Sequence, residues 1–464
     1  MKTFVEPLEA LHGFCDVIKK IENEKGLCSI TGCIDAQKPH MINAFCAFSK
    51  RKKNKLIVTF HEQRAKELYE EYLFFDANAV YYPAKDVLFY QSDIRANVLT
   101  AERIKALKAI HENEQVTVIT TFDALMNTQA PPQKIWDSVL HFVQGQELLL
   151  EEITKILVRM GYEKEHQVET MGQFALRGGI LDIFPLTEEN PVRIEMWGDE
   201  IDTIRTFDTE SQKSVETIDG IRIYPACELV LSEEEKRSGI EKMLKEAKKT
   251  SEKLRKEMKT EEAHRMLSTA EEKAEEWGEL SIYAGMDAYL SYFCEERTSL
   301  LDYFSSITTM VFFDEMTRSI ERGKQTELEF SESMTHRLEK GYILPTQMKE
   351  LFLEREILAK CQQFSCVSLG ALDGKNHGFP SHHVLGIQVK NVNAYNSSFE
   401  LLVKDLKQYK KAHYKVVLLS GSRTRAKRLA QDLQNEELNA FYTDDQERIV
   451  NPGEIVLLYG NVKN

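Results

Sequence analysis

One segment has the position of a phosphate-binding loop but lacks part of its chemistry. The sequence GCIDAQKP at residues 32–39 follows an apolar strand pattern and precedes a helical one. A working GxxxxGK[ST] loop uses glycines for close backbone approach, lysine for phosphate charge and a hydroxyl for magnesium. Gly32 and Lys38 fit this pattern. Gln37 replaces the second glycine, and Pro39 replaces the hydroxyl residue and removes a backbone N–H donor. The sequence therefore predicts a degenerate loop that does not bind nucleotide.

An acidic pair, Asp314-Glu315, follows the apolar run at residues 311–313. In a Walker B or helicase site, such acids organise magnesium and activate water. Without a working phosphate loop they have no nucleotide to act on, so we interpret Asp314 and Glu315 as vestigial or structural acids.

No catalytic or metal-binding signature stands out elsewhere. His377, His382 and His383 form a cluster whose spacing matches no common zinc framework, and Cys361 and Cys366 lie too far away in sequence to support one. The cluster is therefore interpreted as a surface loop, and no metal site is predicted. The chain also contains neither a GxSxG nor an HExxH motif.

The elements that would position these residues alternate between strand and helix patterns over residues 1–130. Such short apolar runs between helices are typical of a mainly parallel sheet covered on both faces. A further apolar run at residues 308–314 has the length and composition of a central strand, so it is expected to rejoin this sheet beside the strand ending near Gly32. The strand candidates of the first region are Leu27–Thr31, Lys55–Phe60, Ala79–Tyr82 and Val116–Thr121.

Residues 172–208 combine strand and turn signals with many charged and aromatic residues. Two glycines at 178–179 permit a bend, and a proline-bounded turn follows. Val192, Ile194 and Met196 then alternate with Arg193, Glu195 and Trp197, which predicts one apolar and one polar face. Arg and Trp are common at the energetic centres of protein interfaces. The alternative is an ordinary half-exposed antiparallel sheet with a solvated charged face.

The amino-acid sequence of residues 172–208 closely resembles the UvrB-homology region of bacterial transcription-repair coupling factors, the Mfd family. The resemblance rests on GQFALRGGILDIFP and PVRIEMWGDEIDTIRTFD, and it extends more broadly over residues 1–345. In that family the segment belongs to a small domain that binds the excision-repair protein UvrA. Members of the Mfd family also resemble UvrB around the positions of residues 32–39 but lack the phosphate-loop motif. The degenerate loop of this chain therefore favours a resemblance to the Mfd family over one to UvrB.

The resemblance implies which residues meet the partner. Arg177 in LRGG and Arg193 in PVRIE match positions of the family's UvrA-binding surface, and Trp197 replaces a phenylalanine found in some relatives. Guanidinium groups form bidentate contacts with carboxylates, and a neighbouring aromatic ring excludes water around them. The alternative for each arginine is an intramolecular salt bridge to Asp182, Glu195 or Asp199.

The predicted architecture is an α/β protein with a degenerate RecA-like, UvrB-like parallel-sheet domain, an inserted small α+β domain and a C-terminal α/β domain. Residues 1–130 and 228–345 form the first domain in two segments, and residues 131–227 form the inserted UvrA-binding domain. Residues 346–464 form a further α/β domain without an assigned role. A charged stretch at residues 231–280 predicts a helix pair with a solvated face.

The predicted function is that of an adaptor that recruits UvrA to stalled RNA polymerase for nucleotide excision repair. In the family, contacts with RNA polymerase and double-stranded DNA, and ATP and magnesium binding by a translocase motor, belong to later domains. These domains are expected to be absent here, so neither enzymatic activity nor a cofactor is predicted for this chain. The alternatives are a UvrB-like helicase or ATPase, and a structural module that masks the translocase.

Composition is consistent with a globular protein of several domains. Sixty basic and 74 acidic residues give a net charge of −14, and a net acidic chain is a poor non-specific DNA binder. The eight cysteines form no CxxC motif, which suits reduced thiols in a cytoplasmic protein. No apolar run approaches the roughly 18 residues of a membrane span.

Overall fold

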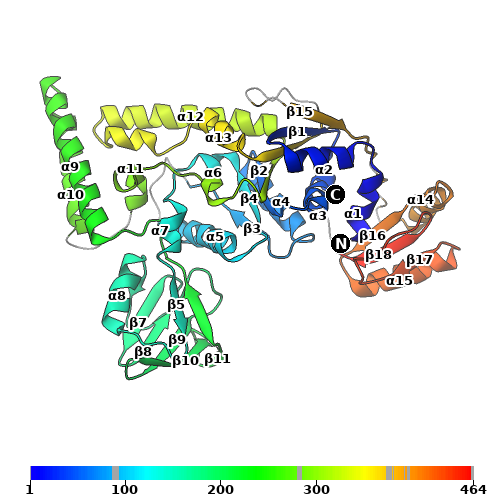
Figure 1. Ribbon diagram of the computed structural model, residues 1–464, viewed down its shortest axis with the longest axis horizontal. Coiled ribbons are helices and arrows are strands. Elements are labelled where there is room, and N and C mark those ends of the chain that lie inside the picture. The colour runs from blue at the N-terminus through cyan, green and yellow to red at the C-terminus, as the bar shows by residue number, and fades with distance from the viewer. Residues whose placement is uncertain are drawn as a thin grey trace.

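The computed structural model describes residues 2–85, 93–278, 285–372, 379, 381–390, 392–393, 395 and 398–460. Its largest unit is a parallel sheet of seven strands in the order β15-β1-β14-β13-β2-β4-β3 (Figure 1). The predicted α/β class is therefore confirmed. The strands are β1 (Gly26–Thr31), β2 (Asn54–Thr59), β3 (Val80–Tyr82), β4 (Thr117–Thr121), β13 (Thr309–Asp314), β14 (Ser365–Gly370) and β15 (Ser381–Gly386).

Helices cover both faces of this sheet because alternate residues of each strand point to opposite sides. In β13, Met310 and Phe312 pack with one set of helices, whereas Val311 and Phe313 pack with the other. The first set is α2 (Phe14–Asn23), α3 (Lys38–Phe48) and α4 (Glu62–Tyr72). The second set is α5 (Asp93–Glu112), α6 (Phe122–Met126), α12 (Met316–Glu339) and α13 (Glu354–Cys361).

The sheet confirms one prediction and corrects two others. β13 joins the sheet begun by the first 130 residues, as predicted. It does not lie beside β1, because β14 pairs with both strands and separates them. The predicted boundary at residues 345/346 is also wrong for the sheet, since β14 and β15 both belong to it. The sequence SCVSLG of β14 has two serines and a glycine, so its strand signal is weak although all six residues are buried.

A small C-terminal unit follows these strands. It is a parallel sheet in the order β16-β18-β17, and α14 and α15 pack on it through a common apolar cluster. The N-terminal helix α1 (Lys2–Val5) contacts this unit, because Thr3 donates hydrogen bonds to the carbonyls of Gln446 and Arg448. The elements of the unit are α14 (Phe399–Lys411), β16 (Val416–Ser420), α15 (Arg423–Asn435), β17 (Ala440–Tyr442) and β18 (Ile455–Tyr459).

The inserted domain is built on a six-stranded, mostly antiparallel sheet in the order β11-β10-β9-β8-β7-β6. One face packs against α8 (Leu150–Arg159) and the small β12-β5 sheet. The other face is mainly polar and includes a small buried apolar cluster of Val168, Ala175 and Phe184. The strands are β5 (Leu140–Val143), β6 (Glu163–Lys164), β7 (Gln173–Arg177), β8 (Ile180–Ile183), β9 (Val192–Trp197), β10 (Glu200–Phe207), β11 (Ser214–Thr217) and β12 (Gly220–Ile223).

Two long helices, α9 (Glu233–Lys256) and α10 (Thr260–Gly278), form an antiparallel arm at one end of the molecule (Figure 1). Ser232 begins α9 with a capping box to Glu235. Met243, Ala247, Leu254 and their neighbours pack between the helices, so the predicted helix pair is confirmed. The remaining short helices are η1 (Glu6–Ala10), η2 (Asp35–Gln37), α7 (Pro132–Trp136), η3 (Met286–Tyr289), α11 (Leu290–Phe293), η4 (Leu300–Tyr303) and η5 (Pro345–Lys349).

A buried ion pair joins the sheet domain to the chain that leaves the inserted domain. Arg103 of α5 donates from Nε and Nη2 to the two carboxylate oxygens of Glu228, at 2.8 and 2.9 Å. Lys85 Nζ lies 3.3 Å from the same carboxylate. Burial on its own would raise the pKa of Glu228, but the attraction of Arg103 and Lys85 outweighs it and lowers this pKa to about 2.

This ion pair predicts an acid-dependent loss of stability. Because the folded-state pKa of Glu228 is depressed, its contribution is present above the unfolded pKa of roughly 4.3 and is lost as the pH falls toward 2. We expect Glu228→Gln to lower the free energy of unfolding by about 3 kcal/mol at pH 7. Urea unfolding at pH 7, 4.5 and 3 should show this difference shrinking as the pH falls. A difference independent of pH would contradict the assignment.

Two further observations concern the chain as a whole. All eight cysteines are free, and six of them are buried. Among the helices of the described residues, none combines the length and the apolar character that crossing a bilayer requires.

Candidate functional site

In the degenerate phosphate loop, Gly32 is required by the packing of the protein's own backbone. Gly32 follows β1 with φ of +80°, and a Cβ atom there would lie 2.1 Å from the carbonyl oxygen of Ile387. Ile387 also donates its backbone N–H to the carbonyl of Thr31. The close approach of this segment therefore requires glycine. After the loop, Gln37 ends η2, and Lys38 and Pro39 begin α3.

Lys38 is buried and donates to three carboxylates. Its Nζ lies 2.5 Å from Asp314 Oδ1, 2.8 Å from Asp35 Oδ1 and 2.9 Å from Glu315 Oε1. Burial alone would lower the pKa of Lys38, but attraction to Asp314 and hydrogen bonds to all three acids raise it above its ordinary value. The ammonium group is thus charged and has used all three of its N–H donors within the protein.

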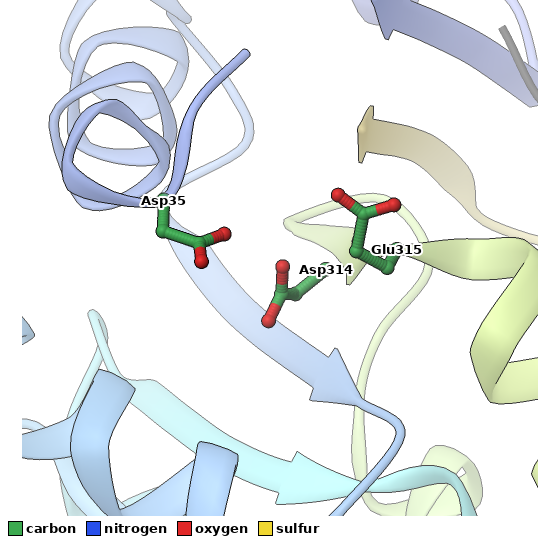
Figure 2. Close-up of side chains that lie close together, drawn as sticks. All are labelled: Asp35, Asp314 and Glu315. Atoms are coloured by element: carbon green, nitrogen blue, oxygen red, sulfur yellow. The ribbon is translucent and has the colours of Figure 1, made fainter. Parts of the chain in front are cut away.

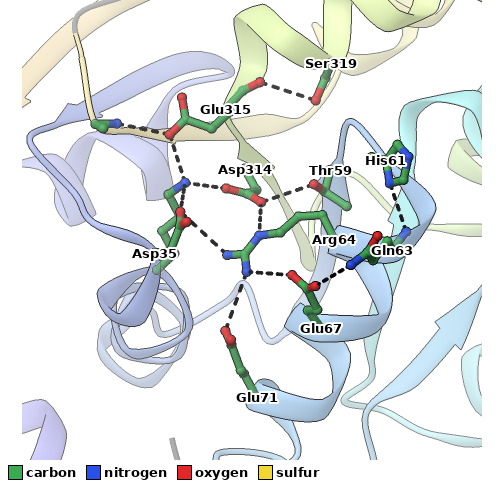
Figure 3. Close-up of polar contacts among 12 residues, drawn as sticks. Asp35, Thr59, His61, Gln63, Arg64, Glu67, Glu71, Asp314, Glu315 and Ser319 are labelled. Atoms are coloured by element: carbon green, nitrogen blue, oxygen red, sulfur yellow. Dashed lines mark hydrogen bonds and ion pairs between the residues drawn. The ribbon is translucent and has the colours of Figure 1, made fainter. Parts of the chain in front are cut away.

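Asp314 forms the centre of this network at the end of β13. It is buried, and besides Lys38 it accepts from Arg64 Nε at 2.9 Å and from Thr59 Oγ1 at 3.1 Å (Figure 3). Arg64 lies on α4, so the network ties the first sequence segment of the domain to the segment that returns at β13. We call Lys38, Asp35, Arg64, Asp314 and Glu315 the remnant-loop network.

The three acids of this network do not fit a resident magnesium ion. Carboxylate oxygens of Asp35, Asp314 and Glu315 lie within 4.8 Å of one another (Figure 2), and such oxygens are the ligands of hard cations. The Lys38 ammonium already lies among them at hydrogen-bond distance from each residue. In a working loop the lysine binds phosphate. Here Lys38 instead neutralises the carboxylates that would bind the metal.

The partner-binding candidates lie on the polar face of the inserted sheet. Asp182 of β8 pairs directly with Arg193 of β9 in the strand register. Arg193 donates to both oxygens of Asp182, at 2.7 and 2.9 Å, and Arg177 Nη2 donates to Asp182 Oδ2 at 2.6 Å. Asp182 is only 1% exposed. The intramolecular alternative considered for both arginines is therefore present, with one carboxylate holding two guanidinium groups.

The two arginines differ in how much they offer a partner. Arg193 also donates to Gln212 and lies over the ring of the buried Phe207, 4.4 Å from its centroid. Its side chain is 16% exposed, against 45% for Arg177. Arg193 therefore supports the face from within, whereas Arg177 presents its guanidinium edge to solvent.

Trp197 lies at the end of β9, in the hairpin that turns at Gly198 with φ of +66°. It is 83% exposed. A large aromatic side chain left in solvent on a polar sheet face is typical of a contact surface. Beside it, Glu195 accepts hydrogen bonds from Arg205 and Thr203 of β10.

Sequence reasoning missed three residues of this face: Arg205, Phe207 and Gln212. Strict alternation in β10 would place Arg205 on the face of the buried Ile201, and the bulge between Ile201 and Thr203 separates the two residues. Phe207 follows Arg205 by two residues and therefore shares its face. Its place under Arg193 depends on the pairing of Arg205 with Arg193 across β10 and β9, which no local pattern indicates.

Of the histidine cluster, His377 lies outside the described residues. His382 and His383 are neighbours in the edge strand β15, where successive side chains point to opposite faces. His383 Nδ1 lies 2.8 Å from Lys20 Nζ. The two histidines are thus strand residues, not the surface loop expected from sequence.

The inserted sheet matches a known domain. The family model described as the UvrB interaction domain matches residues 140–229. This interval contains β5 to β12, and with them Arg177, Arg193 and Trp197. This part of the chain is therefore similar to UvrB interaction domains.

Curated relatives extend the resemblance over most of the chain. It is 29% identical over 390 residues to the transcription-repair-coupling factor of Bacillus subtilis (strain 168), which covers 84% of this chain and 32% of the relative. The same-named protein of Staphylococcus epidermidis (strain ATCC 12228 / FDA PCI 1200) is 25% identical over 417 residues, or 89% and 35% of the two chains. The predicted resemblance to these coupling factors is confirmed. The chain spans about a third of their length.

A second kind of relative matches a shorter part. The UvrABC system protein B of Thermosipho africanus (strain TCF52B) is 32% identical over 282 residues, covering 56% of this chain and 42% of the relative.

Proposed function

We propose that this chain acts as an adaptor in transcription-repair coupling, binding a UvrA-type protein through the polar face of its inserted domain. The observation that carries the proposal is the match of the UvrB interaction domain to residues 140–229, the interval that exposes Trp197 and Arg177. Trp197 supplies apolar contact area, and Arg177 supplies a charged group for a carboxylate of the partner. Recruitment to stalled RNA polymerase would be a property of a whole coupling factor.

Binding of purified UvrA to the 464-residue chain tests the proposal. We expect Trp197→Ala to weaken binding by about 2 kcal/mol, or roughly thirtyfold, because an aromatic side chain that the partner would bury is lost. The thermal midpoint should stay unchanged, since the side chain makes little contact with its own domain. Met258→Ala is the matched control, because Met258 is 88% exposed on the helical arm. No UvrA binding by the unaltered chain would instead favour the structural-module alternative.

We also propose that the seven-stranded domain is a scaffold without ATPase activity. The support is the remnant-loop network: Lys38 is bonded to three acids, Gln37 and Pro39 replace the residues that nucleotide and magnesium require, and Asp314 is buried. Bound nucleotide would have to break these contacts before Lys38 could reach a phosphate.

Calorimetric titration with Mg-ATP provides the check. We expect no saturable heat and no phosphate release. A micromolar dissociation constant, corresponding to about −8 kcal/mol, would contradict the scaffold proposal and favour the UvrB-like ATPase alternative.

A further inference from the structure

The helical arm carries a stripe of five lysines. Lys242, Lys245, Lys249, Lys253 and Lys256 are all exposed on α9. At 100° per residue they fall within about 80° of one another around the helix axis, over a length of ~21 Å. We call these five residues the lysine stripe.

The stripe points away from the packed side of the arm. Met243, Ala247 and Leu254 are buried in the core between α9, α10 and their neighbours. On a helical projection their centre lies about 140° from that of the stripe. None of the five lysines pairs with a carboxylate within the described part of the chain. Three acids flank the stripe on α9: Glu241, Glu246 and Glu252. Glu246 accepts hydrogen bonds from Tyr292 and Thr346.

Charge is unevenly distributed on this acidic protein. Residues 242–259 contain eight basic and three acidic residues, whereas the start of α9 carries Glu233, Glu234 and Glu235. The positive charge is therefore concentrated on the distal half of the arm, which extends from one end of the molecule (Figure 1).

Helix stability does not explain the stripe. Lysines in the last turn, such as Lys253 and Lys256, complement the helix dipole, but this effect fades within one turn and does not reach Lys242, Lys245 or Lys249. The pairs 245/249 and 249/253 place like charges four residues apart, an arrangement that costs about 0.2–0.5 kcal/mol each.

We propose that the lysine stripe binds the phosphate backbone of double-stranded DNA, independently of base sequence. A row of point charges matches a linear polyanion, and non-specific DNA binding comes from phosphate neutralisation by such residues. A protein partner fits less well, because lysine is depleted at protein interfaces and the stripe contains no apolar anchor. This site is separate from the UvrA-binding face and does not depend on it.

The test measures anisotropy of a labelled 30-base-pair duplex with the full chain over a series of salt concentrations. The stripe variant is K245Q/K249Q/K253Q, and the control is K324Q/K404Q/K411Q, which removes three exposed lysines elsewhere. We expect the stripe variant to bind at least tenfold more weakly. The slope of log K against log salt should fall by about 2.7, since each phosphate contact contributes roughly 0.9. The control should bind like the unaltered chain.

Three outcomes would overturn the proposal. The first is unchanged DNA affinity in the stripe variant, and the second is an equal loss in both variants, which would reflect net charge alone. The third is binding of labelled polyglutamate but not of the duplex, which would identify an acidic protein as the partner. Thermal midpoints close to that of the unaltered chain would verify that both variants are folded.

Discussion

Replacing Lys38 with methionine should lower the free energy of unfolding by about 3–5 kcal/mol. The substitution removes an ammonium group that contacts three carboxylates and leaves the buried Asp314 with only Arg64 and Thr59 as donors. Removing one partner of a buried ion pair is costly because the remaining charge stays out of water without compensation. Urea unfolding of the full chain would measure the loss.

The double variant K38M/D314N serves as the control. If Lys38 acts mainly on Asp314, neutralising that acid should recover a large part of the stability, and the double-mutant cycle should give a coupling above 1 kcal/mol. Additive losses, or a Lys38→Met variant as stable as the unaltered chain, would show that the network does not hold the domain together.

The pH dependence of this effect follows from the raised pKa of Lys38. A folded-state pKa above the unfolded value means that the stabilisation is complete below the unfolded lysine pKa of roughly 10.4 and is lost as pH rises further. The stability difference between the unaltered chain and Lys38→Met should therefore be constant from pH 6 to 9 and should shrink above pH 10.5.

The remnant-loop network marks a limit of sequence reasoning. The sequence identifies Lys38 from its loop and Asp314 from its strand, each by local pattern. It does not indicate that the two residues bond to each other, because they lie 276 positions apart in the chain. Their meeting depends on the strand order, and that order places β14 between β1 and β13.

The same distinction separates the correct strand predictions from the missed ones. β2 and β13 are continuous apolar runs, which are typical of strands buried on both faces. β15 has the sequence SHHVLG. It lies at the edge of the sheet, where a strand does not need a continuous apolar run, and its histidines therefore indicated a surface loop. In the inserted domain Asp182 and Arg193 lie only 11 residues apart in the chain, so Asp182 is among the three carboxylates that the sequence offers as local partners for this arginine.

Asp182 connects the stability of the inserted domain with its proposed function. Its carboxylate accepts three hydrogen bonds from Arg177 and Arg193 and is almost completely buried. Asp182→Asn keeps the size of the side chain but removes the charge and turns an amide N–H toward a guanidinium group. We expect a loss of about 3 kcal/mol in the free energy of unfolding, at the lower end for buried pairs because Arg177 is partly solvated.

Glu195→Gln is the matched control, since it makes the same change on the same face. The ion pair of Glu195 with Arg205 is about one-third exposed, so its loss should cost less than about 1 kcal/mol. Equal effects of the two substitutions, measured by urea unfolding, would contradict the central position of Asp182.

Binding to UvrA separates the two contributions of this cluster. Arg177→Ala should leave the free energy of unfolding within about 1 kcal/mol of the unaltered chain, because its bridge is partly exposed. It should nevertheless weaken UvrA binding by about 2–4 kcal/mol if its guanidinium edge meets a carboxylate of the partner. Asp182→Asn should reduce both quantities, because it releases the arginine from its bound position. Arg177→Ala that loses stability but keeps its affinity for UvrA would assign the arginine to folding alone and remove it from the proposed contact.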